Sequence, residues 1–338
     1  MTHVLVVAPS WIGDMVLAQC LFRQLQSQNP PVVIDVLAPD WSRALLNRMP
    51  EVHEIIDMPL GHGELGLRKR YQIGRSLRTR PYVHAVVLPN SLKSALVPYW
   101  AGIPRRTGYV GELRLGLLND CRRVDRSSHP MTAQQFVALG LPAGMALPDS
   151  LPLPGLRVSA RGISRACKQY GLEPGQAPVL ALCPGAEYGQ SKQWPLDYYG
   201  VVARNWLGRG WQVWLFGSAS DRTVCEAIVS QTGGRCRNLA GRTNLEEAVD
   251  LLSLAGMVLS NDSGLMHVAA ALGRPQVAVF GSTDPGKTPP LATDARIEYL
   301  GLGCSPCFQR TCPKAHLRCL RDLEPNRIMR TMEALIER

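Results

Sequence analysis

Val258-Leu259-Ser260-Asn261-Asp262-Ser263-Gly264-Leu265-Met266-His267 combines an apolar strand, a short polar turn and the opening of a helix. The apolar residues before the turn predict a strand that is buried on both faces. The Ala-rich run 268–272 then continues as a helix. A strand that passes directly into a helix is half of a βαβ unit, and such units form parallel sheets.

The same alternation extends in both directions along the chain. Strands are expected at 4–8, 32–37, 54–58 and 85–88, and again at 179–183, 212–216, 256–260 and 276–280. Helices are expected near 14–27, 196–208, 220–231, 244–254, 263–272 and 325–337. Four prolines in the segment 142–155 prevent a regular element there. The sequence predicts an α/β protein with two doubly wound, Rossmann-like domains, residues 1–155 and 156–338, facing a central cleft.

Length and composition agree with two globular domains. A domain usually has ~100–200 residues, and this chain has 338. With 46% hydrophobic and 19% charged residues, the chain is not of the disordered class. No run of 18 or more apolar residues occurs, so no membrane-spanning helix is expected. The N-terminus has no basic segment and reads directly as a strand, so no signal peptide is expected. Ten cysteines without secretory features indicate a reducing, cytoplasmic environment.

Positive charge is concentrated in one segment. The formal net charge is +10, and residues 61–130 hold thirteen Lys or Arg against four Asp or Glu. These side chains either form solvated helix faces or make a surface for an acidic partner, which could be a nucleic acid, an anionic membrane or a phosphorylated substrate.

Two phosphate-binding patterns occur, and we reject both. Gly281-Ser-Thr-Asp-Pro-Gly-Lys-Thr288 matches the P-loop pattern, but its proline and the two that follow remove backbone donors and hinder the helix that a P-loop opens. Gly61-His-Gly-Glu-Leu-Gly66 matches the dinucleotide pattern, but it follows the third strand and lacks an acidic residue about 20 positions later. The first segment is expected to be a proline-stiffened loop.

The loop after the first strand contains a candidate general base. Ser10, Trp11 and Gly13 lead to Asp14 at the start of a helix. Asp14 either caps that helix or acts on a substrate hydroxyl, with Gly13 allowing close approach.

The second half contains a candidate anion site. Lys192 lies in a loop just before Trp194 and Pro195, where a helix begins. The N–H groups of Ser263, Gly264 and Leu265 at a helix start can bind a phosphate. Asp262 could instead cap this helix, and His267 could pack against the sheet. No Asp-x-Asp motif occurs, so we expect no metal-held diphosphate.

These motifs together resemble the bacterial heptosyltransferases of glycosyltransferase family 9. Further stretches strengthen the resemblance, which covers essentially the whole chain: Met58-Pro-Leu-Gly-His-Gly63, Leu88-Pro-Asn-Ser-Leu-Lys-Ser-Ala95, Arg106-Thr-Gly-Tyr-Val-Gly-Glu112 and Gly116-Leu-Leu-Asn-Asp120. The resemblance implies a GT-B fold and an inverting transfer of L-glycero-D-manno-heptose from ADP-heptose to heptosyl-Kdo2-lipid A. That reaction adds the second inner-core heptose of lipopolysaccharide. Addition of the first heptose, or another reaction of the family, is the alternative.

The resemblance also implies roles for individual residues. The N-terminal domain would bind the acceptor and the C-terminal domain the donor, with Asp14 as base and Lys192 on the diphosphate; the last helix is free to pack back on the first domain. The expected donor-binding residues are Glu187, Tyr188, Lys192, Asp221, Thr243, Asp262, Ser263, Gly264, Leu265 and His267. The expected acceptor-binding residues are Ser10, Trp11, Gly13, His62, Asn90, Ser91, Lys93, Arg105 and Arg106. We expect a cytoplasmic monomer at the anionic inner face of the inner membrane, with no catalytic metal.

Cys304, Cys307, Cys312 and Cys319 have the spacing C-x2-C-x4-C-x6-C. Four thiolates can hold structural zinc, although the later spacings are less typical and the assigned chemistry needs no metal. Free thiols are the expectation, with zinc or a redox pair as alternatives. Two other functional classes also stay open, a nucleic-acid-binding protein and a sugar-nucleotide epimerase. The first lacks interleaved aromatic residues and a recognition module, and the second would act on the donor alone.

Overall fold

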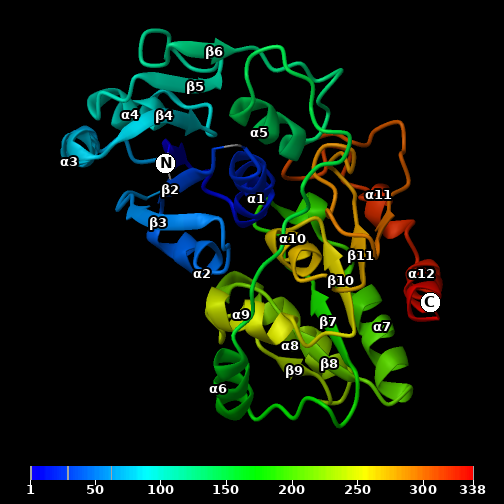
Figure 1. Cartoon of the computed structure of the whole chain (residues 1–338). Coiled ribbons are helices and arrows are strands. Elements are labelled where there is room, and N and C mark those ends of the chain that lie inside the picture. Colours follow the sequence, from blue (N-terminus) through cyan, green and yellow to red (C-terminus); the bar gives the residue numbers. More distant parts are fainter. Residues whose placement is uncertain (1, 29, 62, 338) are drawn as a thin grey trace. The chain divides into compact units, whose positions relative to one another are not determined.

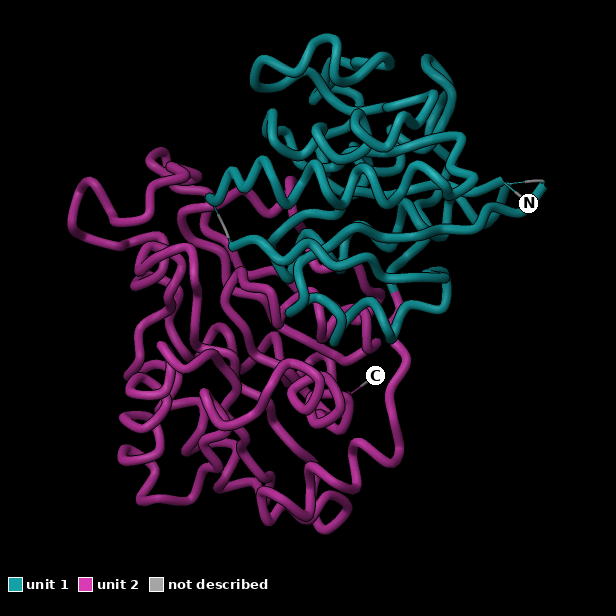
Figure 2. Tube along the Cα trace, turned by 90° about the vertical axis from the view of Figure 1, so that its left-hand side faces the viewer, with its two compact units in different colours: residues 1–154 teal, residues 155–338 magenta. Residues whose placement is uncertain are grey.

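The chain forms two compact units, residues 1–154 and 155–338 (Figure 2). The structure is a computed structural model that describes residues 2–28, 30–61 and 63–337. Each unit has one six-stranded sheet with flanking helices (Figure 1). The predicted α/β class is therefore confirmed.

Unit 1 places its helices between successive strands. Its elements are β1 (Thr2–Val7), α1 (Ile12–Gln26), β2 (Val32–Ala38), α2 (Arg43–Leu46), β3 (Val52–Asp57), α3 (Leu67–Ser76), β4 (Tyr82–Val87), η3 (Leu92–Ala95), α4 (Leu96–Trp100), β5 (Arg105–Tyr109), β6 (Asp120–Arg122) and α5 (Thr132–Gly140). Short 3-10 turns η1 (Asp40–Ser42) and η2 (Leu77–Thr79) precede α2 and β4.

Unit 2 repeats the alternation. Its elements are α6 (Ala160–Tyr170), β7 (Val179–Cys183), η4 (Gln190–Lys192), α7 (Leu196–Gly208), β8 (Gln212–Leu215), η5 (Ala219–Asp221), α8 (Arg222–Gln231), β9 (Arg237–Asn238), α9 (Leu245–Leu252), β10 (Met257–Asn261), α10 (Gly264–Ala271), β11 (Gln276–Val279), β12 (Ala295–Glu298), α11 (Arg318–Arg321) and α12 (Pro325–Ile336).

The two sheets share one strand order. Unit 1 has the order β3-β2-β1-β4-β5-β6 and unit 2 has β12-β11-β10-β7-β8-β9, with parallel pairing throughout. Counted within each unit, both are the doubly wound order 3-2-1-4-5-6. Ligands of such sheets bind beyond the carboxyl ends of the first and fourth strands, where the strand order reverses. The loops after β1 and β4, and those after β7 and β10, are therefore the expected ligand-binding loops.

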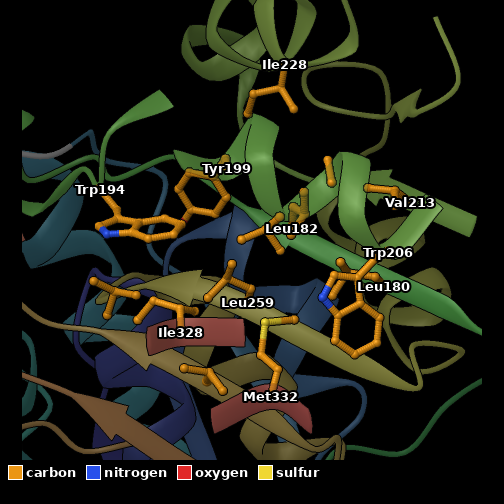
Figure 3. Packing of buried hydrophobic residues seen from close by; sticks show 14 of the residues in the cluster. Leu180, Leu182, Trp194, Tyr199, Trp206, Val213, Ile228, Leu259, Ile328 and Met332 are labelled. Atoms are coloured by element: carbon orange, nitrogen blue, oxygen red, sulfur yellow. The ribbon is translucent and has the colours of Figure 1, made fainter. Parts of the chain in front are cut away.

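The core of unit 2 joins its sheet to α7 and to the last helix. Leu180 and Leu182 of β7 pack with Trp206 of α7 and with Ile328 and Met332 of α12 (Figure 3). The last helix thus contributes its apolar face to the core of unit 2, against α7 and β11. Every one of these side chains is almost fully buried.

Several elements have no apolar run in the sequence and were not predicted. β5, with the sequence Arg-Arg-Thr-Gly-Tyr, is the clearest example. Its place in the sheet comes from pairing with β4 and β6. No helix in the described ranges has both the length and the apolar character needed to cross a bilayer.

Candidate active site

Asn261 holds the two loops of unit 2 that meet at the strand-order reversal. This buried residue ends β10, and its Oδ1 accepts hydrogen bonds from the Trp194 backbone N–H and the Tyr199 hydroxyl, both at 3.0 Å. Its Nδ2 donates to the Pro184 carbonyl at 2.6 Å, directly after β7. The loop that carries Lys192 is thereby fixed beside the end of β10.

Lys192 and Asp262 form a largely buried ion pair. Lys192 Nζ lies 2.6 Å from Asp262 Oδ2, and the Thr283 hydroxyl donates to the same oxygen at 2.5 Å. The Lys192 ammonium also lies 4.9 Å from the centre of the Tyr188 ring, a cation–π distance. Asp262 therefore orients the lysine. The alternative that Asp262 caps the following helix is wrong, because the N-cap position belongs to Ser263.

The start of α10 lies next to this pair. Ser263 is the N-cap, its side chain makes no capping hydrogen bond, and the helix begins at Gly264. The first N–H groups of a helix carry partial positive charge and have no partner within the helix. Lys192 and the start of α10 thus lie together around the Asp262 carboxylate, and an ammonium next to a helix start is an arrangement that can bind a phosphate.

His267 is buried one turn into α10. Burial lowers the pKa of His267 to about 4, with the Lys192 charge acting in the same direction and the Asp262 charge against it. The imidazole is therefore neutral at pH 7 and lies within electrostatic reach of the ion pair.

Tyr188 and Glu187 lie on the loop between β7 and η4. The Tyr188 hydroxyl donates to the Phe308 carbonyl at 2.5 Å, and the Arg310 guanidinium lies 5.6 Å from the centre of its ring. Ser220 Oγ approaches Glu187 Oε1 at 3.5 Å. This side of the site is therefore built partly by the segment that follows β12.

Asp221 and Thr243 are engaged in local structure. Asp221 Oδ2 accepts hydrogen bonds from the Ser218 N–H and hydroxyl, both at 2.8 Å. A Cβ on Gly185 would lie 2.3 Å from the Asp221 carboxylate, so only glycine fits there. Thr243 Oγ1 donates to the Leu239 carbonyl at 3.2 Å. Asp221 thus shapes the loop after β7.

In unit 1, the loop after β1 places Asp14 in the first turn of α1, half-buried. The N-cap position belongs to Trp11, so the alternative role of Asp14 as N-cap is wrong. Trp11 and Ser10 are exposed before it. A carboxylate in this turn is stabilised by the positive end of the helix.

The loop after β4 lies at the same sheet edge, because β1 and β4 are parallel neighbours. It carries the exposed Asn90, whose Oδ1 accepts from Arg114 Nη2 at 3.1 Å, and the half-buried Ser91 and Lys93. Lys93 Nζ donates to the Glu64 carbonyl at 3.2 Å. The structure therefore brings the predicted acceptor residues of these two loops to one edge.

Arg105 and Arg106 do not join that edge. They begin β5 and lie at the amino ends of the strands. Arg105 pairs with Asp120 at 3.0 Å, and Arg106 donates to the Leu117 and Ile103 carbonyls, both at 2.6 Å. His62, a further predicted acceptor residue, lies outside the described residues.

In the described parts of the chain, Asp35, His53 and Glu54 converge as potential metal ligands, whereas the four C-terminal cysteines form no such group. Arg80 pairs with Glu54, and the Tyr82 hydroxyl donates to Asp35 Oδ2 at 2.5 Å, so the first group is already a polar network. The cysteines are free thiols. Burial and the neighbouring thiols raise the pKa of Cys319 to about 11.

Sequence reasoning missed Asn261 and Thr283 as supports of the site. Thr283 belongs to the segment that matched the P-loop pattern, and this segment opens no helix. Its neighbour Ser282 lies 3.0 Å from Ser191 Oγ, next to Lys192. The Gly-Ser-Thr sequence at a strand end was the available signal. Its role as a partner of Asp262 required the fold.

Comparison with known proteins identifies the family. The profile of glycosyltransferase family 9 (heptosyltransferase) matches residues 70–318. Lipopolysaccharide heptosyltransferase 2 of Escherichia coli K12 is 44% identical over 98% of both chains. The chain belongs to glycosyltransferase family 9. Lipooligosaccharide heptosyltransferase 2 of Haemophilus ducreyi is 41% identical over 98% of this chain and 99% of its own.

The solved structure of E. coli ADP-heptose lps heptosyltransferase II superimposes with a TM-score of 0.88 at 43% identity, covering 100% of this chain and 99% of that one. The expected GT-B class with two Rossmann-like domains is thereby confirmed. As a family 9 heptosyltransferase, the protein is an enzyme that transfers a glycosyl group. This assignment favours glycosyl transfer over the epimerase and nucleic-acid-binding alternatives.

Proposed function

We propose that the protein transfers L-glycero-D-manno-heptose from ADP-heptose to heptosyl-Kdo2-lipid A and so adds the second heptose of the lipopolysaccharide inner core. The observation that carries the proposal is the Lys192–Asp262 pair at the start of α10, in a chain 44% identical over 98% of its length to a lipopolysaccharide heptosyltransferase 2. Residues 156–338 bind the donor and residues 1–155 bind the acceptor.

The donor edge stabilises the leaving group. As the bond between the anomeric carbon and the diphosphate oxygen breaks, negative charge grows on the departing ADP. Lys192 and the N–H groups at the start of α10 receive that charge. Asp262 keeps the ammonium in place through its 2.6 Å contact. Because these groups supply the positive charge, the transfer needs no metal ion.

The acceptor edge supplies the base. Asp14 takes the proton of the acceptor hydroxyl, whose oxygen attacks the anomeric carbon from the face opposite ADP, and the configuration inverts. Ser10, Trp11, Gly13, Asn90, Ser91 and Lys93 surround the acceptor sugars. The enzyme works at the cytoplasmic face of the inner membrane, where the lipid acceptor lies.

The test is a transfer reaction with purified protein, ADP-heptose and heptosyl-Kdo2-lipid A, analysed by mass spectrometry. We expect the acceptor to gain one heptose and an equal amount of ADP to appear, with the same yield in EDTA. An acceptor that already carries the second heptose is the control. Consumption of ADP-heptose without the acceptor, or a strict need for added Mg²⁺, would contradict the proposal.

A further inference from the structure

Residues 110–119 form the crossover between β5 and β6, which we name the leucine loop. In this loop two apolar side chains are exposed and a charged one is buried. Leu113 is 89% exposed and Leu115 is 74% exposed, whereas Arg114 between them is 1% exposed. Arginine is among the residue types least often buried, and large exposed apolar side chains that lie together mark interaction sites.

Arg114 fixes the loop from inside. Its Nε donates to the Tyr109 carbonyl at 3.0 Å, and its Nη1 donates to the Pro89 carbonyl at 2.5 Å. Its Nη2 donates to Asn90 Oδ1 at 3.1 Å. One buried guanidinium thus ties the middle of the loop to the ends of β4 and β5, so the two leucines point outward from a held backbone.

The arm before Arg114 is also tethered. Glu112 Oε2 accepts a hydrogen bond from the Leu92 N–H at 2.8 Å, and the Glu112 N–H donates to the Asn90 carbonyl at 3.3 Å. A Cβ on Gly111 would lie 2.3 Å from that same carbonyl oxygen, so the close approach requires glycine. The leucine loop therefore lies against the loop of Asn90 and Ser91, where we place the acceptor.

The charge around the loop favours an anionic partner. Residues 61–130 carry a formal excess of nine positive charges, and the arginines among them that are neither buried nor paired are available to a partner. The Val110 N–H donates to the Arg122 carbonyl at 2.7 Å, which brings the leucine loop to the segment holding the exposed Arg123 and Arg126. Exposed leucines beside arginines match the interface of an anionic bilayer, which attracts Lys and Arg near its surface.

A second copy of the chain is a poorer fit. A stable protein interface buries about 1,200–2,000 Å² in total, and two leucines on a narrow loop supply a small part of that. Insertion into a lipid surface needs only a few apolar side chains next to basic ones.

We propose that the leucine loop inserts Leu113 and Leu115 into the surface of an anionic phospholipid bilayer. The loop thereby holds the loops after β1 and β4 at the membrane, where a lipid-linked acceptor presents its sugars. This inference rests on the proposed function for the identity of the acceptor, but the binding to lipid itself can be measured without any acceptor.

The test compares the Leu113→Asn, Leu115→Asn double variant with wild type in sedimentation with vesicles of phosphatidylethanolamine and phosphatidylglycerol. We expect at least about a tenfold loss of vesicle affinity, because two leucines no longer leave water. Activity on a deacylated, water-soluble acceptor should stay at the wild-type level. Val158→Asn, which changes an exposed apolar residue of unit 2, is the matched control and should bind vesicles normally.

Wild-type protein that does not bind the vesicles, or a double variant that binds them as well as wild type, would overturn the inference. A leucine-dependent dimer without vesicle binding would assign the loop to a second copy and also overturn it. Failure of wild type to glycosylate either acceptor would count against the proposed function alone, so the two failures are distinguishable.

Discussion

Lys192 is held in place by its contacts with Asp262 and Tyr188, and in the proposed mechanism its charge stabilises the departing ADP. We expect Lys192→Ala to lower kcat/KM by about 10²–10³, the typical cost of losing one such electrostatic contact. Steady-state kinetics with ADP-heptose measures this. Lys168→Ala, an exposed lysine at the end of α6, is the control. A fall smaller than threefold would remove Lys192 from the proposed mechanism.

Substitution of Asp14 tests whether this residue is the base that deprotonates the acceptor hydroxyl. Asp14→Asn keeps the size of the side chain but removes the base, so kcat should fall by about 10²–10⁴ while the affinity for ADP-heptose, measured by calorimetry, stays the same. The matched control is Asp197→Asn, which changes another aspartate in the first turn of a helix. Normal turnover of Asp14→Asn would show that another group accepts the proton.

His267 gives a dependence of stability on pH. Its folded-state pKa of about 4 lies below the ordinary value of about 6.5, so between these values the unfolded chain binds a proton that the folded chain does not. The neutral His267 therefore makes its full contribution to the free energy of unfolding above about pH 6.5, and this contribution is lost as the pH falls toward 4. At pH 5 the loss relative to pH 7 is about 2 kcal/mol.

The measurement is urea unfolding, followed by tryptophan fluorescence, at pH 7 and pH 5. His267→Gln should lose less stability than wild type over this interval, and His129→Gln should behave as wild type. Equal losses in all three proteins would show that His267 does not cause the dependence.

Among the elements, α12 shows how a helix at the end of the chain supports the site. Met332 is fully buried between α12 and the sheet of unit 2 (Figure 3), and the Trp194 Nε1 donates to the Leu323 carbonyl just before this helix. We expect Met332→Ala to lower the free energy of unfolding by about 2–5 kcal/mol, because it leaves a cavity. Ile336→Ala at the exposed end of α12 is the control and should change stability by less than about 0.5 kcal/mol.

At the scale of the whole molecule, the positive charge of the sequence is divided between structure and surface. Arg70 and Arg114 are buried, and Arg80, Arg105 and Arg122 form ion pairs within unit 1. Only part of the excess positive charge in residues 61–130 is therefore available to a partner. The expectation that Arg105 and Arg106 bind the acceptor does not follow from their positions at the amino edge of the sheet.

Charge reversal distinguishes the arginines that are paired within unit 1 from those that are available to a partner. Arg105→Glu with Arg106→Glu should lower the melting temperature, because a carboxylate at position 105 would repel Asp120 and the Leu117 carbonyl would lose its donor. Arg123→Glu with Arg126→Glu should leave melting unchanged and weaken binding to anionic vesicles most at low salt. Calorimetric melting and vesicle sedimentation check both pairs. Weaker vesicle binding by the first pair, without a change in melting, would contradict this division.

The sequence alone determined the alternation of strands and helices, the two-domain organisation and the turns after β1 and β10. Each of these features is local: a run of apolar residues, a proline-rich segment, or a polar turn followed by an Ala-rich helix. Hydrophobic periodicity over a few residues is sufficient to predict such elements. The place of Asp14 and Lys192 at strand ends followed from the same patterns.

Only the tertiary structure decided which side chains meet. The partners of Asp262 are Lys192, 70 residues away, and Thr283, 21 residues away, and no local pattern relates them. The polar sequence of β5 gives no local sign of a strand, so Arg105 was expected beside the acceptor until strand pairing placed it, still exposed, at the amino edge of the sheet. Likewise, the burial of Arg114 and the exposure of its neighbouring leucines depend on carbonyls from distant strand ends, because a guanidinium can be buried only where such acceptors converge.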